Sequence, residues 1–364
     1  MSDNNVTSKA LSSAPRVHES VGVLHMHTLY SDGTGTVGQI ANYAEERGLQ
    51  WLIITDHCHL EAYERGEYGR YGNVWVLIGT ELGDEDLPNH YLAYGITELP
   101  EQLDPVQMVK DVTKLGGFGA IAHPHEKRDE FEEMPPYPWT AWEAPFDGIE
   151  IWNQLSQWVE GLTHTNKYRR FLHPLKSLTG PDKATLRIWD ELNLRRPVVG
   201  YVGVDAHALD YPVLRGMFKL RVFAYKVQFR SLQTHLLLPE PLNQSDFQIA
   251  NEQILTALRN GHHYGANHRV GDARGFRFIA TQGGIHYHPI ATLTSGETIH
   301  FRVKVPMCAR IHLIRNGQLL MRVRGRSLRY ESSQPGIYRV EVFRKATGWI
   351  FSNPFRVVDS AKCG

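Results

Sequence analysis

Two histidines at alternate positions, His25 and His27, close the first long apolar run of the chain. Alternate residues of a strand lie on one face of its sheet, so we expect both imidazoles to point the same way, an arrangement that suits a metal ion. Asp32 follows in a turn-forming Ser-Asp-Gly sequence. After an amphipathic segment, the apolar run 51–54 leads to His57. Residues of ligand type at successive strand ends predict one shared site.

Later apolar runs end in the same residue types. The candidate ligands at or near their ends are Glu81, His90, His123, Asp205 and His207. Pro124 stops the strand that delivers His123, because proline cannot continue a β-ladder. Asp205 and His207 repeat the alternate spacing of the first two histidines. Strands that alternate with helices, each ending in a ligand, predict a parallel α/β barrel with its site at the C-terminal rim.

The order His-x-His, Ser-Asp-Gly and Thr-Asp-His, closed by Asp-x-His, resembles the PHP (polymerase and histidinol phosphatase) superfamily of metal-dependent hydrolases. The resemblance implies a distorted (β/α)7 barrel holding two or three divalent metal ions. It assigns His25, His27, Glu81 and Asp205 to a first metal, Glu81, His90 and His123 to a second, and Asp32, His57 and His207 to a third. Nitrogen and carboxylate ligands without thiolate suit Zn²⁺, Mn²⁺ or Fe²⁺. Every ligand position of the family is filled, which argues for a working active site.

The leading hypothesis is a metal-dependent phosphoesterase that hydrolyses a small phosphomonoester or phosphodiester by attack of a metal-activated hydroxide. Divalent ions make such an attack feasible by lowering the pKa of a bound water from about 15.7 to about 7. The overall arrangement also resembles the stand-alone branch that includes the carbaryl hydrolases, so a carbamate or carboxylic ester hydrolase is the alternative. A non-catalytic metal-binding interaction module is the alternative from another class.

Two further histidines, His59 and His125, flank ligand positions and are the candidate catalytic acids, although a metal-bound water would serve the same purpose. The candidate cations for phosphate oxygens are Arg65, Arg70, Arg128 and Arg215. For the first two of these arginines, a solvated surface role is the stronger expectation. Glu150 and Asn153 belong to another expected strand, where they either line the pocket or form hydrogen bonds inside the barrel.

Composition narrows the possible partners. The 364 residues contain 39 Lys and Arg against 39 Asp and Glu, so the formal net charge is zero. We therefore expect a small-molecule substrate, with neither nucleic acid as a stable partner nor a membrane. Three scattered cysteines form no metal-binding or disulfide pattern, which favours a reducing, cytoplasmic location. The polar residues 1–20 predict a disordered tail rather than a signal peptide or membrane span.

The pattern of apolar and turn-forming residues changes near residue 275. Residues 21–270 are expected to form the barrel with its flanking helices, including a helix at 105–115 and another at 251–260. Beyond this point short alternating runs are separated by turn signals such as Asn316-Gly317. This spacing predicts a small antiparallel β-sandwich of immunoglobulin-like size over residues 275–358, with a packing or substrate-shaping role.

Overall fold

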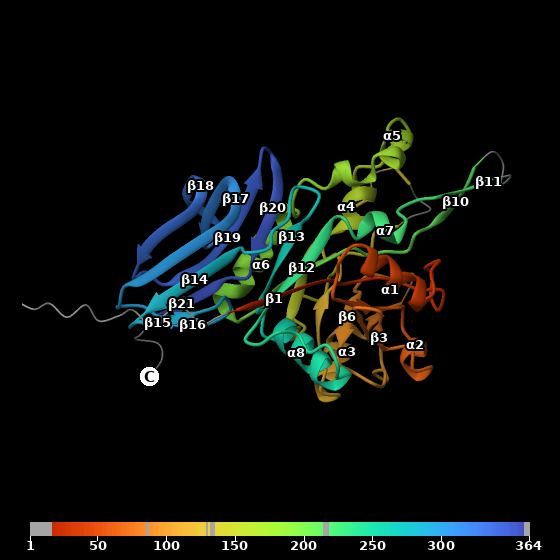
Figure 1. Ribbon diagram of the computed structural model, residues 1–364, viewed down its shortest axis with the longest axis horizontal. Coiled ribbons are helices and arrows are strands. Elements are labelled where there is room, and N and C mark those ends of the chain that lie inside the picture. Colours follow the sequence, from red (N-terminus) through yellow and green to blue (C-terminus); the bar gives the residue numbers. More distant parts are fainter. Residues whose placement is uncertain (1–16, 85–86, 129, 132–134, 214–217, 360–364) are drawn as a thin grey trace, which may run out of the picture.

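The fold is of the mixed α/β class and consists of one sheet of 14 strands, a second of 5 strands and a separate two-stranded hairpin (Figure 1). The computed structural model describes residues 17–84, 87–128, 130–131, 135–213 and 218–359. Within them, none of the helices is both long and apolar enough to cross a membrane.

Eight strands from the two sheets surround the candidate ligands. Strands β1 (His18–Val23), β2 (Trp51–Ile54) and β4 (Val74–Ile78) are parallel neighbours in the larger sheet. The smaller sheet has the order β5 (Thr80–Leu82), β6 (Tyr91–Tyr94), β7 (Phe118–Ile121), β8 (Gly148–Asn153) and β9 (Val199–Gly203). Isolated bridges, Met26 with Ala206 and His57 with Glu81, join the two sheets on both sides.

One strand departs from the expected parallel arrangement. β6 runs antiparallel to both β5 and β7. The segment between β5 and β6 is too short for a crossover helix, and a parallel connection needs a dozen or more residues. The alternation of strand and helix is therefore interrupted where His90 enters the site.

Helices outside the strands begin where the sequence provides caps. α1 (Val37–Glu46) has a capping box between Thr36 and Gln39, and α3 (Pro105–Lys114) is capped by Asp104, which confirms the predicted helix there. α8 (Phe247–Arg259) begins four residues before the predicted start, because Asp246 accepts hydrogen bonds from the first turn. The other helices are α2 (Glu61–Glu64), α4 (Gln154–Glu160), α5 (Lys167–Leu172), the 3₁₀ helix η1 (Pro174–Ser177), α6 (Lys183–Arg195) and α7 (Tyr225–Gln228).

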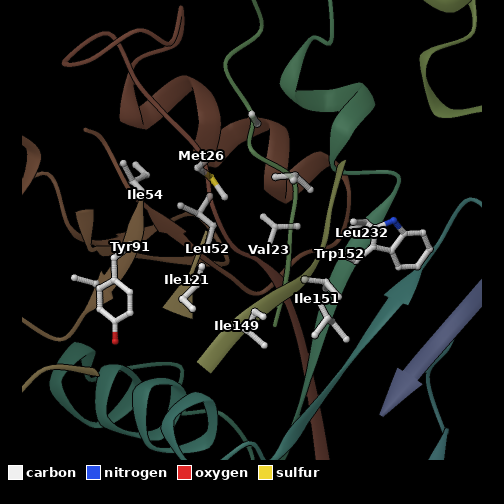
Figure 2. Close-up of a cluster of buried hydrophobic side chains, with 14 of the residues drawn as sticks. Val23, Met26, Leu52, Ile54, Tyr91, Ile121, Ile149, Ile151, Trp152 and Leu232 are labelled. Atoms are coloured by element: carbon white, nitrogen blue, oxygen red, sulfur yellow. The ribbon is translucent and has the colours of Figure 1, made fainter. Parts of the chain in front are cut away.

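The N-terminal part of the chain, up to about residue 232, has an apolar core contributed by strands that are far apart in the sequence. Figure 2 shows side chains from β1, β2, β6, β7, β8 and β12 gathered in it. Those labelled are Val23, Met26, Leu52, Ile54, Tyr91, Ile121, Ile149, Ile151, Trp152 and Leu232, and all are buried. Their removal from water stabilises the strands whose C-terminal ends carry the ligands.

The C-terminal strands are hydrogen-bonded into the larger sheet, and the separate β-sandwich over residues 275–358 stays a prediction. Their bounds are β14 (Arg277–Gln282), β15 (Ile285–Tyr287), β16 (Thr292–Thr294), β17 (Ile299–Arg315), β18 (Gln318–Ser332), β19 (Gly336–Arg344), β20 (Thr347–Ser352) and β21 (Phe355–Val358). β20 pairs with β13 (His263–Asn267), which pairs with β12 (Leu232–Leu238) and so with β1. The predicted turn at Asn316-Gly317 is confirmed between β17 and β18, with positive φ at both residues.

Contacts between side chains also connect the two halves. Arg339 in β19 forms a buried ion pair with Asp190 in α6, with its Nε 2.7 Å from Oδ1. The ring of Phe351 in β20 packs against the ring of Trp152 in β8, with 5.4 Å between the ring centroids. Three further strands lie at the margins of the sheets: β3 (Gly69–Tyr71), and β10 (Asp210–Val213) with β11 (Phe218–Arg221), which form the separate hairpin. Residues 18–20 of the expected tail belong to β1, because β1 pairs with β12 from His18 onward.

The carboxylate of Glu19 in β1 connects four strands. It accepts hydrogen bonds from Tyr264 in β13 and Arg277 in β14, and lies 2.6 Å from His235 Nδ1 in β12. Burial opposes the charged form of Glu19, but His235, Tyr264 and Arg277 outweigh burial and lower the pKa of Glu19 to about 2. A carboxyl with a lowered pKa stabilises the fold above its unfolded pKa, and this contribution disappears as the pH falls through the folded pKa.

We predict that Glu19→Gln lowers the free energy of unfolding at pH 7 by up to about 3 kcal/mol, the linkage value of the shift. The variant should also lose less stability than the wild type between about pH 4.5 and 2, where the Glu19 contribution disappears. Urea unfolding at several pH values measures both effects. The exposed Glu98 gives the control Glu98→Gln, and equal acid sensitivity in all three proteins would contradict the prediction.

Candidate metal centre

Most of the candidate ligands lie close to strand ends, and three of them hold uncommon backbone conformations. The φ angles are 66° at His25, 26° at His123 and 53° at Asp205. Positive φ is uncommon for residues other than glycine, costs on the order of 1–3 kcal/mol, and clusters at functional sites. The surrounding sheet therefore maintains a conformation that these residues would not adopt by themselves, and it turns their side chains toward one centre.

Glu81 occupies that centre. Its Oε2 lies 2.9 Å from His25 Nε2 and 3.3 Å from His27 Nε2, and its Oε1 lies 3.0 Å from His90 Nδ1 and 3.1 Å from His123 Nε2. The side chain is only 1% exposed. A buried carboxylate surrounded by imidazoles on both oxygens can bridge two cations.

The two aspartates extend the cluster in opposite directions. Asp205 Oδ1 lies 3.5 Å from Nε2 of both His25 and His27, deep in the site. Asp32 Oδ2 lies 3.1 Å from His207 Nε2, and the Asp32 side chain is 54% exposed. The cluster therefore reaches from the buried centre to the surface of the molecule.

Donor atoms form four groups, and within each group all atoms lie within 4.8 Å of one another. The groups are His27, Asp32, His57 and His207; His25, His27 and Glu81; His25, His123 and Asp205; and His57, Glu81 and His90. The first contains the third ligand set implied by the sequence, with His27 added. Glu81 belongs to two groups, as a bridging ligand must.

Unpartnered ring nitrogens show that the residues fit metal ions. Both nitrogens of His27 and Nδ1 of His123 are buried and have no hydrogen-bond partner among the described residues. A buried polar atom without a partner is costly, and coordination of a cation would remove that cost. The donor set, imidazole nitrogen with carboxylate oxygen, suits a divalent transition metal.

The electrostatics of the cluster also favour bound cations. Burial opposes a charge on the His27 ring, but the nearby carboxylates of Asp205 and Glu81 outweigh burial and raise the pKa of His27 to about 10. In the same way, Glu126 and Glu81 raise the pKa of His123 to about 9 against the effect of burial. The buried carboxylates thus strongly stabilise positive charge in the site. Divalent ions would supply that charge while the histidines remain neutral.

A second layer of polar residues orients the ligands. Glu150 Oε1 lies 3.0 Å from His25 Nδ1, and its Oε2 accepts hydrogen bonds from the His123 backbone and from Asn153. Asn153 also donates to Asp205 Oδ2 at 3.0 Å. Such contacts orient metal-binding side chains and select the tautomer of a histidine. Both residues therefore support the ligands by hydrogen bonding inside the barrel.

A cleft of about 340 Å³ opens over the ligands. Its apolar wall consists of Pro135, Tyr137, Leu155, Trp158, Val159 and Leu209. Arg128 also lines the cleft; its side chain is 10% exposed, and its Nη2 lies 2.6 Å from Glu126 Oε1. The Nε of Arg128 is buried without a hydrogen-bond partner among the described residues. Glu126 was missed by the sequence reasoning, since an isolated glutamate after His-Pro-His carries no recognisable spacing.

The nine predicted ligands are brought together, but the other predicted site residues lie elsewhere, with Arg128 as the exception. His59 Nε2 lies 2.8 Å from the Tyr30 carbonyl, and His125 Nδ1 lies 3.0 Å from Thr185 Oγ1, and neither histidine lines the cleft. Arg65 pairs with Glu61 in the first turn of α2. Arg70 donates to the carbonyls of Gly72 and Gln244, away from the cleft. Arg215 lies outside the described residues.

Comparison with known proteins agrees with this site. Residues 24–149 match the PHP domain family, and seven of the nine candidate ligands fall within the match. This part of the chain is therefore a PHP domain, the class of domain expected from the ligand pattern.

Solved structures give weaker likenesses. One is a two-domain protein from Bacteroides vulgatus containing a predicted PHP-like metal-dependent phosphoesterase, with 16% identity and a TM-score of 0.44, covering 93% of this chain and 95% of that one. Another is an amidohydrolase from Chromobacterium violaceum, with 15% identity and a TM-score of 0.31, covering 51% and 87%. No curated protein matches the sequence.

We predict that the purified protein, reconstituted with Mn²⁺ or Zn²⁺ and desalted, retains two or three ions per chain. Glu81→Ala should lose more than one ion, because Glu81 belongs to two donor groups, whereas His207→Ala should lose about one. Elemental analysis of each protein measures the metal content. His59→Ala is the control and should keep the wild-type content. Equal losses in the first two variants would contradict the bridging role.

Proposed function

We propose that this protein is a metal-dependent phosphoesterase that hydrolyses a small phosphomonoester or phosphodiester by direct attack of water. The observation that carries the proposal is the cluster of nine histidine and carboxylate ligands centred on Glu81, seven of which line the cleft. The PHP domain match over residues 24–149 supports a metal-dependent hydrolase.

Bound divalent ions would supply an activated water and neutralise charge on the phosphoryl oxygens. His25, His27, Glu81 and Asp205 would hold the ions deepest in the site, and Asp32, His57 and His207 would hold one nearer the opening. The side chain of Asp32 is half exposed, so this end of the cluster faces an incoming substrate. Glu150 and Asn153 keep the deeper ligands in position.

Direct attack by water is supported by what the cleft contains. Among the described residues that line it there is no serine, threonine, cysteine or lysine. The histidines and carboxylates of its floor are engaged as candidate ligands. This set of lining side chains favours water as the attacking group.

We predict that a single turnover in ¹⁸O-labelled water places the label in the released phosphate, because the attacking oxygen comes from solvent. Mass spectrometry of the product measures it. A parallel quench experiment should trap no phosphorylated protein during turnover. A phosphorylated side chain that forms and decays at a competent rate would overturn the proposed mechanism.

Arg128 is the cation placed to bind a phosphoryl oxygen. Glu126 holds one end of the guanidinium, and the Ser156 hydroxyl and the Tyr137 backbone N–H donate to Glu126 in turn. The Nε of Arg128 remains available as a donor. A guanidinium fixed in this way is preorganised for an anionic oxygen.

We predict that Arg128→Met lowers kcat/KM for a phosphate ester by about 10- to 100-fold, the value of one or two hydrogen bonds to a charged group. Arg128→Lys should recover part of the loss. Steady-state assays of p-nitrophenyl phosphate and its bis-ester measure the effect. Arg65→Met, on the surface of α2, is the matched control and should behave as the wild type.

The apolar wall of the cleft favours a second candidate, hydrolysis of a carbamate or carboxylic ester. Leu155, Trp158 and Val159 would accommodate an aryl group. Arg128 separates the two functions, since a neutral ester gains little from its charge. A naphthyl carbamate, assayed in parallel with the phosphate esters on the reconstituted protein, decides between them: faster hydrolysis of the carbamate, with no loss in Arg128→Met, would support the second candidate.

A further inference from the structure

The zero net charge of the chain hides a strong division between its two parts. Residues 271–364 contain 15 Lys and Arg against 5 Asp and Glu, whereas residues 1–270 contain 24 against 34. The C-terminal strands that carry the excess positive charge lie at the opposite end of the molecule from α1 and α2 (Figure 1). The positive charge is thus concentrated in one region.

A surface depression of about 820 Å³ gathers part of this charge, and we call it the basic groove. The segment that follows β13, the middle of β17 and β18, and the β19–β20 turn together line it. Its cationic residues are Arg269, Arg310, Arg324, Arg344 and Lys345. It shares no lining residue with the cleft over the metal ligands.

The cations of the groove are not neutralised within the described part of the chain. None of the five forms a salt bridge with a described carboxylate. Arg310 and Arg344 donate to the backbone carbonyls of Lys345 and Val270, contacts that orient a guanidinium without removing its charge. Their positive potential is therefore directed to solvent.

Pairing across the strands brings like charges together along the same face. Arg310 of β17 lies directly opposite Arg324 of β18, and further along the ladder Arg302 lies opposite Arg329. All four side chains are exposed. Like charges directly opposite one another destabilise a sheet. Two such pairs, each of which lowers the stability of the sheet, therefore indicate that these arginines have a role in binding.

Protection of a sheet edge does not account for these residues. Charged side chains on an edge strand discourage aggregation, and β18 pairs only with β17. However, β17 pairs with β14, β18 and β19, so Arg302 and Arg310 do not belong to an edge strand. Edge protection can explain the cations of β18, but it cannot explain those of the interior strand β17.

We propose that the basic groove binds the phosphate backbone of nucleic acid without reading its sequence. Arginine supplies four of the five cations, and its planar fork suits phosphate oxygens. Interfaces with nucleic acid are more polar and far more positive than those between proteins.

Two other occupants fit the groove less well. A protein partner, including a second copy of this chain, needs an apolar centre, and an anionic membrane needs apolar side chains to insert. The apolar residues that line the groove are small or partly buried: Val270 and Phe343 are half-buried, and Ala309 is buried. The groove therefore attracts a partner mainly through its positive charge, and the partner that fits such a surface is a polyanion.

Fluorescence anisotropy with labelled 30-residue single-stranded and duplex DNA tests the proposal on the full chain, with gel analysis to confirm that the DNA stays intact. With five phosphate contacts, raising the salt from 50 to 200 mM should weaken binding about 100-fold for the single strand and about 500-fold for the duplex. The double variant Arg310→Glu with Arg324→Glu should bind at least about 10-fold more weakly at 50 mM salt and show a smaller salt dependence.

Lys110→Glu with Lys114→Glu, on the exposed side of α3, changes the net charge by the same amount and should bind DNA as the wild type does. Both double variants should hydrolyse p-nitrophenyl phosphate at the same rate. Retained hydrolysis shows that the protein is folded, so that weaker DNA binding reports on the groove itself.

Equal weakening by both pairs of substitutions would overturn the proposal, since net charge alone would then explain binding. Absence of DNA binding at 50 mM salt would also overturn it. Two results would replace the proposal with another occupant, provided that the wild type does not bind DNA. One is binding to vesicles with 30% phosphatidylserine that the groove variant loses. The other is self-association, detected by light scattering, that the groove variant loses.

Discussion

The metal centre depends on one buried carboxylate. Glu81 is 1% exposed and has nitrogens of five histidines within 3.7 Å, and these histidines come from four separate segments of the chain. A carboxylate removed from water is very costly unless positive charge or hydrogen bonds compensate it. The fold must therefore bring four segments to within 3.7 Å of one carboxylate. The positive φ angles at His25, His123 and Asp205 are the local cost of that convergence.

The same requirement explains the departure from a regular barrel. His90 reaches Glu81 from the start of β6, which runs antiparallel to its neighbours, so its first residue meets the C-terminal ends of the parallel strands. A parallel strand in this position would carry its first residue to the other end of the sheet. The irregular strand is thus a means of adding a ligand without a crossover helix.

The sequence predicts most of the ligand set, because the signals are local. The alternate spacing of His25 and His27, repeated in Asp205 and His207, is visible in the sequence itself. Their convergence also depends on the positive φ at His25 and Asp205, which lie beyond the ends of β1 and β9. By contrast, the pairing of β20 with β13 depends on strands more than 80 residues apart, and no periodicity encodes it. Arg70 illustrates the same limit: it lies close in sequence to His57, yet its strand directs it to the Gln244 carbonyl. Glu126 acts through Arg128 and His123, contacts that only the folded chain creates.

The pairing of β1 also has a consequence for biosynthesis. On one side β1 pairs with β2, which is made soon after it, but on the other it pairs with β12, and His18 faces Leu238. At ordinary rates of translation, roughly 10 to 40 s separate the appearance of the two strands at the ribosome. During that interval β1 has an open edge, and the cluster lacks Asp205 and His207. A chain interrupted in this period would expose an apolar strand edge and would lack two of the nine candidate ligands, so the metal centre is completed only when translation has passed β9.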